Sequence, residues 1–226
     1  MSHFSKQKGF TPTPILEKIG VSLQGKRGFT LIELLVSLAI MAVITTVIMF
    51  NQGNYTDAAA LRNAADDLGL TFTEAQTYGI AVRERQADSS DFTSAYGVSI
   101  TLLEQGAQTG YISFFDRNAN EYYDSGWGCP PAETGSECRG KTIFPRGAYV
   151  ESFCILRSSG GDICNNVSRV DVAFHRPNPE AQLMFFNSGG NQYAPANIIG
   201  ALIRLRSPGG LTREVKVYNT GQISIQ

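Results

Sequence analysis

The pattern of hydrophobic and polar positions shows a long apolar run near the N-terminus. Between Leu34 and Phe50 the sequence LLVSLAIMAVITTVIMF contains no charged residue. As a helix this run rises about 25 Å, and a start at Phe29 extends it to about 33 Å, enough to cross the hydrocarbon core of a bilayer. We therefore predict a membrane-spanning helical segment over residues 29–51.

After residue 51 the pattern becomes amphipathic. Apolar and small side chains recur at spacings of three and four, and charged side chains fall between them. This spacing predicts that the same helix continues over residues 52–86 with one stripe buried against a folded domain. The predicted stripe consists of Leu61, Ala64, Ala65, Leu68, Phe72, Ala75, Gly79 and Val82.

Beyond the helix, residues 87–226 predict a β-rich domain. Short runs of β-branched and aromatic residues alternate with turn sequences, whereas residues 126–140 show no period and predict a loop. One long N-terminal helix packed on an antiparallel β-sheet domain is an α+β fold. The predicted strands are 96–103, 111–116, 148–156, 167–175, 181–187, 197–207, 212–219 and 222–226.

The charge distribution also predicts how the chain is oriented across a membrane. Residues 1–28 carry five basic side chains and one acidic, a net of +4, and the other 198 residues carry 14 basic and 19 acidic, a net of −5. Lys26 and Arg27 precede the apolar run, so the positive-inside rule places the N-terminus in the cytoplasm and the domain outside. A cleaved secretory signal peptide is the alternative, but no Ala-x-Ala site follows the run.

The head of the apolar run reads Lys26-Arg-Gly-Phe-Thr-Leu-Ile-Glu-Leu-Leu35. It resembles the type IV prepilin signal over about 25 residues. The resemblance implies that a membrane prepilin peptidase removes residues 1–28 as a leader, cutting after Gly28, and methylates the new N-terminus at Phe29. Glycine suits such a site because it lets the backbone extend into a protease. A second Gly-Phe-Thr at Gly9 is followed by two prolines and by no long apolar run, so we interpret it as a decoy.

Glu33 is the one formal charge on the predicted membrane helix. A charge in lipid is costly and indicates function. The resemblance implies a role in assembly, in which Glu33 pairs with the Phe29 ammonium of its own chain or of a neighbour. The alternative is that Glu33 favours the positive end of its own helix dipole.

The resemblance implies a non-enzymatic, structural function. We expect a minor pilin or pseudopilin of a type IV pilus or of a type II secretion pseudopilus, and the C-terminal strands are similar to those of the GspH/FimT class. The implied partners are prepilin peptidase and other pilins or pseudopilins. The implied location is the inner membrane, single-pass, and then the filament. The alternative function is a minor pilin that binds DNA or another ligand in DNA uptake or adhesion.

Four cysteines fall in the predicted domain, at Cys129, Cys138, Cys154 and Cys164. Their spacings differ from the Cys-x-x-Cys pairs of zinc sites, and an even count in an exported, loop-rich region favours disulfides. Of three pairings, we favour the local ones, Cys129–Cys138 and Cys154–Cys164. Four free thiols are the alternative.

Residues after the predicted strand 111–116 form an oxygen-rich series. Asp116, Asn118, Asn120 and Asp124, with the carbonyl of Tyr122, follow the ligand order of a calcium loop. Two positions depart from that order: Glu121 stands where glycine is usual, and Trp127 stands where glutamate is. Some pseudopilins bind calcium in outer loops, so we expect no required cofactor but a candidate structural calcium, which Glu133 or Glu137 would complete. An Asx-rich turn is the alternative.

Basic residues gather in the last strands, at Arg204, Arg206, Arg213 and Lys216. They form a candidate DNA-phosphate contact, although a solvated strand face is the stronger explanation, because the domain is acidic and the cluster is small. Enzyme constellations are lacking in the sequence: His3 lies in the leader, His175 has no partner, and no glycine-rich phosphate loop occurs.

Overall fold

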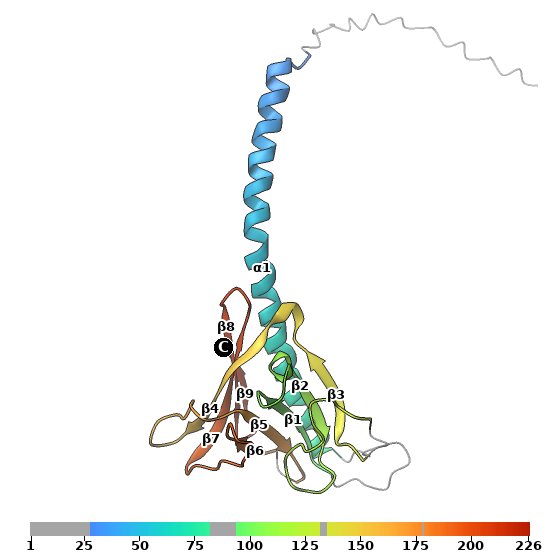
Figure 1. The fold of residues 1–226 in the computed structure, drawn as a ribbon, viewed down its shortest axis with the longest axis vertical. Coiled ribbons are helices and arrows are strands. Elements are labelled where there is room, and N and C mark those ends of the chain that lie inside the picture. Colours follow the sequence, from blue (N-terminus) through green and yellow to red (C-terminus); the bar gives the residue numbers. More distant parts are fainter. Residues whose placement is uncertain (1–27, 82–93, 132–134, 178) are drawn as a thin grey trace, which may run out of the picture. The chain divides into compact units, whose positions relative to one another are not determined.

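The computed structural model describes residues 28–81, 94–131, 135–177 and 179–226. This part of the chain contains one long helix and nine strands (Figure 1). Two short 3₁₀ turns accompany them, η1 at Ala107–Thr109 and η3 at Pro145–Gly147. The chain divides into two compact units between Val47 and Ile48.

The helix α1 spans Leu31–Ile80, 50 residues, and passes residue 51 without a break, as predicted. Its predicted continuation over 82–86 lies outside the described residues. A continuous helix is expected here because neither half contains proline, the residue that breaks a helix interior.

The N-terminal stretch of α1, Leu31–Met49, is long and apolar enough to cross a membrane, and none of it is buried within the chain. Its polar side chains are satisfied locally. The hydroxyls of Ser37, Thr45 and Thr46 donate to the carbonyls four residues earlier, at 2.8, 2.6 and 2.7 Å. Such back-bonding removes free donors from a surface that only lipid or other apolar groups can cover.

The second unit contains the remainder of α1 and two antiparallel sheets. Sheet A has five strands in the order β3-β2-β1-β5-β6, and sheet B has four in the order β4-β7-β8-β9. Sheet A comprises β1 Tyr96–Thr101, β2 Gly110–Phe115, β3 Cys138–Ile143, β5 Arg169–Phe174 and β6 Ala181–Phe186. Sheet B comprises β4 Tyr149–Arg157, β7 Ile198–Arg206, β8 Thr212–Tyr218 and β9 Ile223–Ile225.

The α+β class is confirmed, but the domain has two sheets where the sequence suggested one. The eight predicted strands are found within two residues at each end. The loop prediction for 126–140 is wrong at its end, because β3 begins at Cys138. This edge strand pairs with β2 alone and exposes most of its side chains, so it lacks the alternation that identifies a half-buried strand.

The main core lies between α1 and the two sheets. The predicted helix stripe is buried over its described length, from Leu61 to Gly79, while Val82 lies outside the described residues. In β1 and β2 alternate residues join this core, as expected for side chains that point to opposite faces of a strand. Sheet B adds Phe153, Ile203 and Val215.

Sheet A also has a covered outer face. Ile112 and Phe114 of β2 point away from the main core and pack with Tyr123 and Cys138. The loop that follows β2 therefore lies on this face and buries β1 on both sides. The residues predicted to bind calcium belong to this loop.

Candidate functional site

The cleavage segment occupies the start of the described chain. Gly28, Phe29 and Thr30 are exposed and non-helical, and a Cβ at Gly28 would meet nothing within 4 Å. Phe29 is 79% exposed. The two described residues that flank the predicted scissile bond, Gly28 and Phe29, are thus exposed to solvent.

Glu33 lies in the first turn of α1 and forms a reciprocal cap with Thr30. The Glu33 amide donates to Thr30 Oγ1 at 3.3 Å, and Glu33 Oε2 accepts from the Thr30 amide at 3.4 Å. This is the capping box, in which two otherwise unpaired helix donors are satisfied. Within one chain, Glu33 therefore makes its contacts at the N-terminal end of its own helix, which is where the helix-dipole alternative also places it. Its assembly role stays a proposal.

Both local disulfides are present. Cys129 pairs with Cys138, with their Cα atoms 5.2 Å apart, and Cys154 pairs with Cys164, with their Cα atoms 4.0 Å apart. The first joins the loop on sheet A to the start of β3, and the second closes a turn beyond Ile155, which bridges Ile163. The preferred pairing is confirmed.

The predicted calcium residues are brought together, but as a hydrogen-bonded turn. Asp116 is 2% exposed. Its Oδ1 accepts from the amides of Asn118 and Asn120 at 3.2 and 3.3 Å, and its Oδ2 accepts from the amide of Glu121 at 2.8 Å. The side-chain oxygens Oδ1 of Asn118 and Asn120 likewise accept backbone amides, from Asn120 and Tyr122 respectively. These contacts are those of consecutive Asx turns.

Asp124 and Glu137 complete this turn. Asp124 Oδ2 accepts from the side-chain amides of Asn118 and Asn120 at 2.9 and 3.3 Å. Glu137 accepts from the amides of Arg117 and Asp124 at 2.9 and 3.2 Å. Burial raises the pKa of Glu137 to about 7, and the nearby charge of Asp124 adds to the shift. Glu133 lies outside the described residues.

Asp116 Oδ2 and the side-chain oxygens of Asn118 and Asn120 each accept one backbone amide, which leaves each of them a second lone pair for another donor or an ion. In the described part of the chain, no group of three or more His, Cys, Asp or Glu side chains could hold a metal. Calcium binding by this turn stays a proposal.

Three of the four C-terminal basic residues are paired with acidic ones. Arg204 donates to Glu214 at 2.7 Å across the β7–β8 pair, and Lys216 lies 3.8 Å from the same carboxyl group. Arg206 forms an ion pair with Glu151. Arg213 is exposed and forms no ion pair with a described residue. Together with these acidic partners, the cluster has a smaller net positive charge than its four basic residues alone, which weakens the case for a DNA contact.

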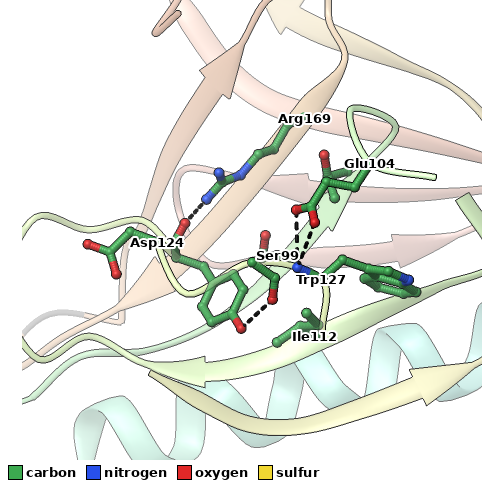
Figure 2. Close-up of a pocket in the computed structure, with 9 residues that line it drawn as sticks. Ser99, Glu104, Ile112, Asp124, Trp127 and Arg169 are labelled. Atoms are coloured by element: carbon green, nitrogen blue, oxygen red, sulfur yellow. Dashed lines mark hydrogen bonds between the residues drawn. The ribbon is translucent and has the colours of Figure 1, made fainter. Parts of the chain in front are cut away.

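A cavity of about 200 Å³ opens between sheet A and the loop that covers it (Figure 2). Figure 2 shows Glu104 reaching the backbone of Trp127, and the Glu104 carboxyl oxygens accept that amide at 3.1 and 3.0 Å. Arg169 donates to the Tyr123 carbonyl from the other side. Two separate side chains thus hold the loop by its backbone.

Beneath the cavity lies a fully buried carboxylate, Asp171. It accepts from Ser99 Oγ at 2.7 Å, from the Tyr123 amide at 2.9 Å and from Arg169 Nε at 3.0 Å. Buried charge requires such partners, and no described buried side-chain atom lacks one. Sequence reasoning missed this cluster, because the alternation of β5 gives no sign that Asp171 faces a loop rather than solvent. We interpret it as a structural anchor of the loop.

Comparison with known proteins bears on the N-terminal segment. Residues 23–49 match the family described as the prokaryotic N-terminal methylation motif. No curated protein and no solved structure matches the chain. The GspH/FimT class therefore stays a prediction. The matched residues include the basic pair, Gly28, Phe29, Glu33 and the exposed apolar part of α1. This N-terminal motif marks type IV prepilin-like proteins.

Proposed function

We propose that the protein is an assembly subunit, a minor pilin or pseudopilin, of a type IV pilus or a type II secretion pseudopilus. The observation that carries the proposal is the methylation motif at residues 23–49, at the start of an apolar helix that no described residue buries. A long exposed apolar surface needs either lipid or the apolar surfaces of other subunits. A filament subunit uses both in turn.

The first step is processing. Prepilin peptidase removes residues 1–28 and methylates Phe29. The exposed, uncrowded backbone at Gly28 supports this step, since a protease needs an extended chain of several residues. Leu31–Met49 holds the protein in the inner membrane before and after cleavage, and in the precursor Lys26 and Arg27 keep the N-terminus in the cytoplasm.

The second step is transfer into a filament. There the apolar side chains of α1 exchange lipid for neighbouring helices, which costs little because both surroundings are apolar. Glu33 cannot move from lipid to a position among neighbouring helices without a partner, because a carboxylate buried there is costly unless it is paired. The Phe29 ammonium of a neighbour provides that partner and so fixes the axial register of the subunit.

The proposal is tested by expressing the full chain with a prepilin peptidase and a filament-forming set of pilins, and by locating it with an antibody. We expect the processed chain to co-purify with sheared filaments. A processed chain that stays entirely in the membrane fraction, while the filaments form normally without it, would exclude an assembly role.

The alternative function, DNA or ligand binding by a minor pilin, has less support. It relies on Arg204, Arg206, Arg213 and Lys216, three of which are already paired with carboxylates. Retention of DNA at low salt that is lost on neutralising all four residues would favour it.

A further inference from the structure

The β7–β8 turn lies at one end of the second unit, beside α1 (Figure 1). The turn is Ser207–Leu211, closed by the Gly210 amide, which donates to the Ser207 carbonyl at 2.9 Å. A Cβ at Gly209 would lie 3.6 Å from Asp57 Oδ2, so the turn touches α1 at Asp57. Arg146 of η3 reaches the same carboxyl group, with Nε 3.0 Å from Oδ1.

Covalent connection limits how far this end of the unit can lie from the apolar span. Asp57 follows Met49, the last residue of the apolar span, by eight positions. Eight residues span at most about 29 Å even when fully extended, whatever path they take. The opposite end of the unit is marked by Gln76, which donates to the Gly221 carbonyl in the β8–β9 turn at 3.2 Å. Along α1, Gln76 lies about 28 Å beyond Asp57.

The surface at the Asp57 end combines exposed apolar and basic side chains. Tyr55 is 77% exposed and Leu211 is 43% exposed. Tyrosine with aliphatic neighbours is typical of the interface between lipid and water, where a ring can sit at headgroup level. We call Tyr55, Arg146, Arg206, Pro208 and Leu211 the juxtamembrane surface.

Its charges are layered, with guanidinium groups outside and carboxylates beneath. The Arg146 side chain is 54% exposed and its partner Asp57 is 21% exposed. The Arg206 side chain, next to Gly210 of the turn, is 41% exposed and its partner Glu151 is 28% exposed. In each pair the positive group faces outward and keeps N–H donors for a further anion, because a guanidinium has five.

We propose that the juxtamembrane surface docks on the membrane that the chain spans, with Arg146 and Arg206 on anionic phospholipid headgroups and with Tyr55 and Leu211 at the interface. Docking would hold the domain against the bilayer before assembly. The proposal depends on membrane insertion of α1 and does not require a filament. Phospholipid is favoured over DNA because the surface is tethered within reach of headgroups. It also gives Arg206 a role other than the DNA contact that its sequence position suggested.

The test uses the full chain in vesicles that contain a lipid spin-labelled at its headgroup. In a Trp127→Phe background, one variant carries Leu211→Trp in the β7–β8 turn, and its matched control carries Thr220→Trp in the β8–β9 turn. We expect the spin label to quench fluorescence at position 211 and not at 220, and quenching at 211 to increase when phosphatidylglycerol replaces part of the phosphatidylcholine. Equal quenching at both positions would overturn the proposal.

Arginine variants test whether the charges of the juxtamembrane surface contribute to docking, apart from the covalent tether. Arg146→Gln and Arg206→Gln should each lower the ratio of docked to undocked domain about fivefold in anionic vesicles, since one arginine near such a surface contributes about 1 kcal/mol. Arg139→Gln is the control, because Arg139 pairs with Glu74 toward the far end of the helix.

Three further outcomes would each overturn a defined part of the account. Arginine variants that lose DNA retention without any change in quenching would overturn the lipid proposal in favour of a nucleic-acid contact. A chain that fails to float with the vesicles would overturn both this proposal and the membrane stage of the proposed function. A chain that floats, with no quenching at position 211, would overturn this proposal alone.

Discussion

Thr30 and Glu33 cap the first turn of α1 reciprocally, with the Glu33 amide 3.3 Å from Thr30 Oγ1 and the Thr30 amide 3.4 Å from Glu33 Oε2. Glu33 therefore has partners within its own chain before any neighbour arrives. Assembly as proposed must exchange the contacts of the Glu33 carboxylate, which accepts from the Thr30 amide and from Thr30 Oγ1 at 3.4 Å, both neutral donors, for one with an ammonium group. Hydrogen bonds to charged donors are stronger, so the exchange is favourable once the neighbour is placed.

Glu33→Ala should insert into membranes at least as well as the unaltered chain and yet fail to enter filaments. The substitution removes a charge that is costly in lipid, but it also removes the proposed partner of the Phe29 ammonium. Membrane fractionation and immunoblotting of sheared filaments measure the two effects separately. Normal incorporation would show that the carboxylate does not set the register.

Thr30→Val tests the cap independently of the charge. Loss of an N-cap hydroxyl costs about 1 kcal/mol of helix stability, so the first turn should fray while Glu33 stays available to a neighbour. We expect incorporation to be retained, and Thr30→Ser to behave as the unaltered chain. Abolished incorporation in Thr30→Val alone would indicate that Thr30 acts in assembly directly.

Gly79 has a packing role that can be measured as stability. A Cβ at this position would lie 2.4 Å from the carbonyl oxygen of Phe174. Gly79→Ala should therefore destabilise the domain by about 1–3 kcal/mol, the usual cost of overpacking. Gly53→Ala is the matched control in the same helix: nothing lies within 4 Å, and the change should stabilise by about 0.5–1 kcal/mol. Chemical denaturation of both variants measures the difference, and an unchanged Gly79→Ala would contradict the observed approach of helix and strand.

The raised pKa of Glu137 predicts a slope of stability with pH. Its pKa is about 7 in the folded protein against 4.5 for an ordinary glutamate. Between these values the folded state binds more protons than the unfolded state, so stability should fall as pH rises from 4.5 to 7. Melting temperature against pH, measured in chelator, should show this fall, and Glu137→Gln should flatten it. Glu180→Gln, at an exposed site, should leave the slope unchanged. An identical slope in Glu137→Gln would contradict the assignment.

Calcium binding is tested by stability as well. If the turn at Asp116–Asp124 holds an ion, a hundredfold excess of calcium over its dissociation constant stabilises the fold by about 2.7 kcal/mol. The melting temperature should then fall in chelator, with the disulfides kept oxidised. Asp116→Ala should remove the difference, but Asp116 also accepts three backbone amides and its loss could unfold the turn. Asp124→Asn, which keeps a hydrogen-bond acceptor, is the second variant. Indifference of the unaltered chain to calcium and chelator would leave an Asx-rich turn.

The sequence predicted features that depend on local pattern. The apolar N-terminal segment of α1 follows from an uninterrupted uncharged run, and the buried stripe from Leu61 to Gly79 and the positions of eight strands follow from periodicity. Prediction from the sequence failed where tertiary contacts determine the structure. The edge strand β3 is defined by pairing with β2 rather than by alternation, and the division into two sheets depends on which strands pair. The Thr30–Glu33 cap depends on a helix start at Leu31, two residues later than the apolar pattern suggested.

Some of the candidate site residues could likewise be predicted from the sequence, and others could not. The motif at Gly28 and Phe29 is contiguous, so it can be recognised without a structure. The cluster of Asp171, Arg169 and Ser99 joins β1 and β5 to a loop, and nothing in the spacing of those residues along the chain indicates it. The structure also shows that the acidic partners of Arg204 and Arg206 lie on neighbouring strands.

The most direct test of the account is the intact mass of the full chain after co-expression with a prepilin peptidase. Cleavage after Gly28 predicts loss of residues 1–28 and the addition of one methyl group at Phe29. Gly28→Val should keep the precursor at full length in the membrane, because a β-branched side chain hinders the extended backbone that the peptidase needs. A mature chain that begins at Phe10, or one that begins after residue 50, would contradict the account.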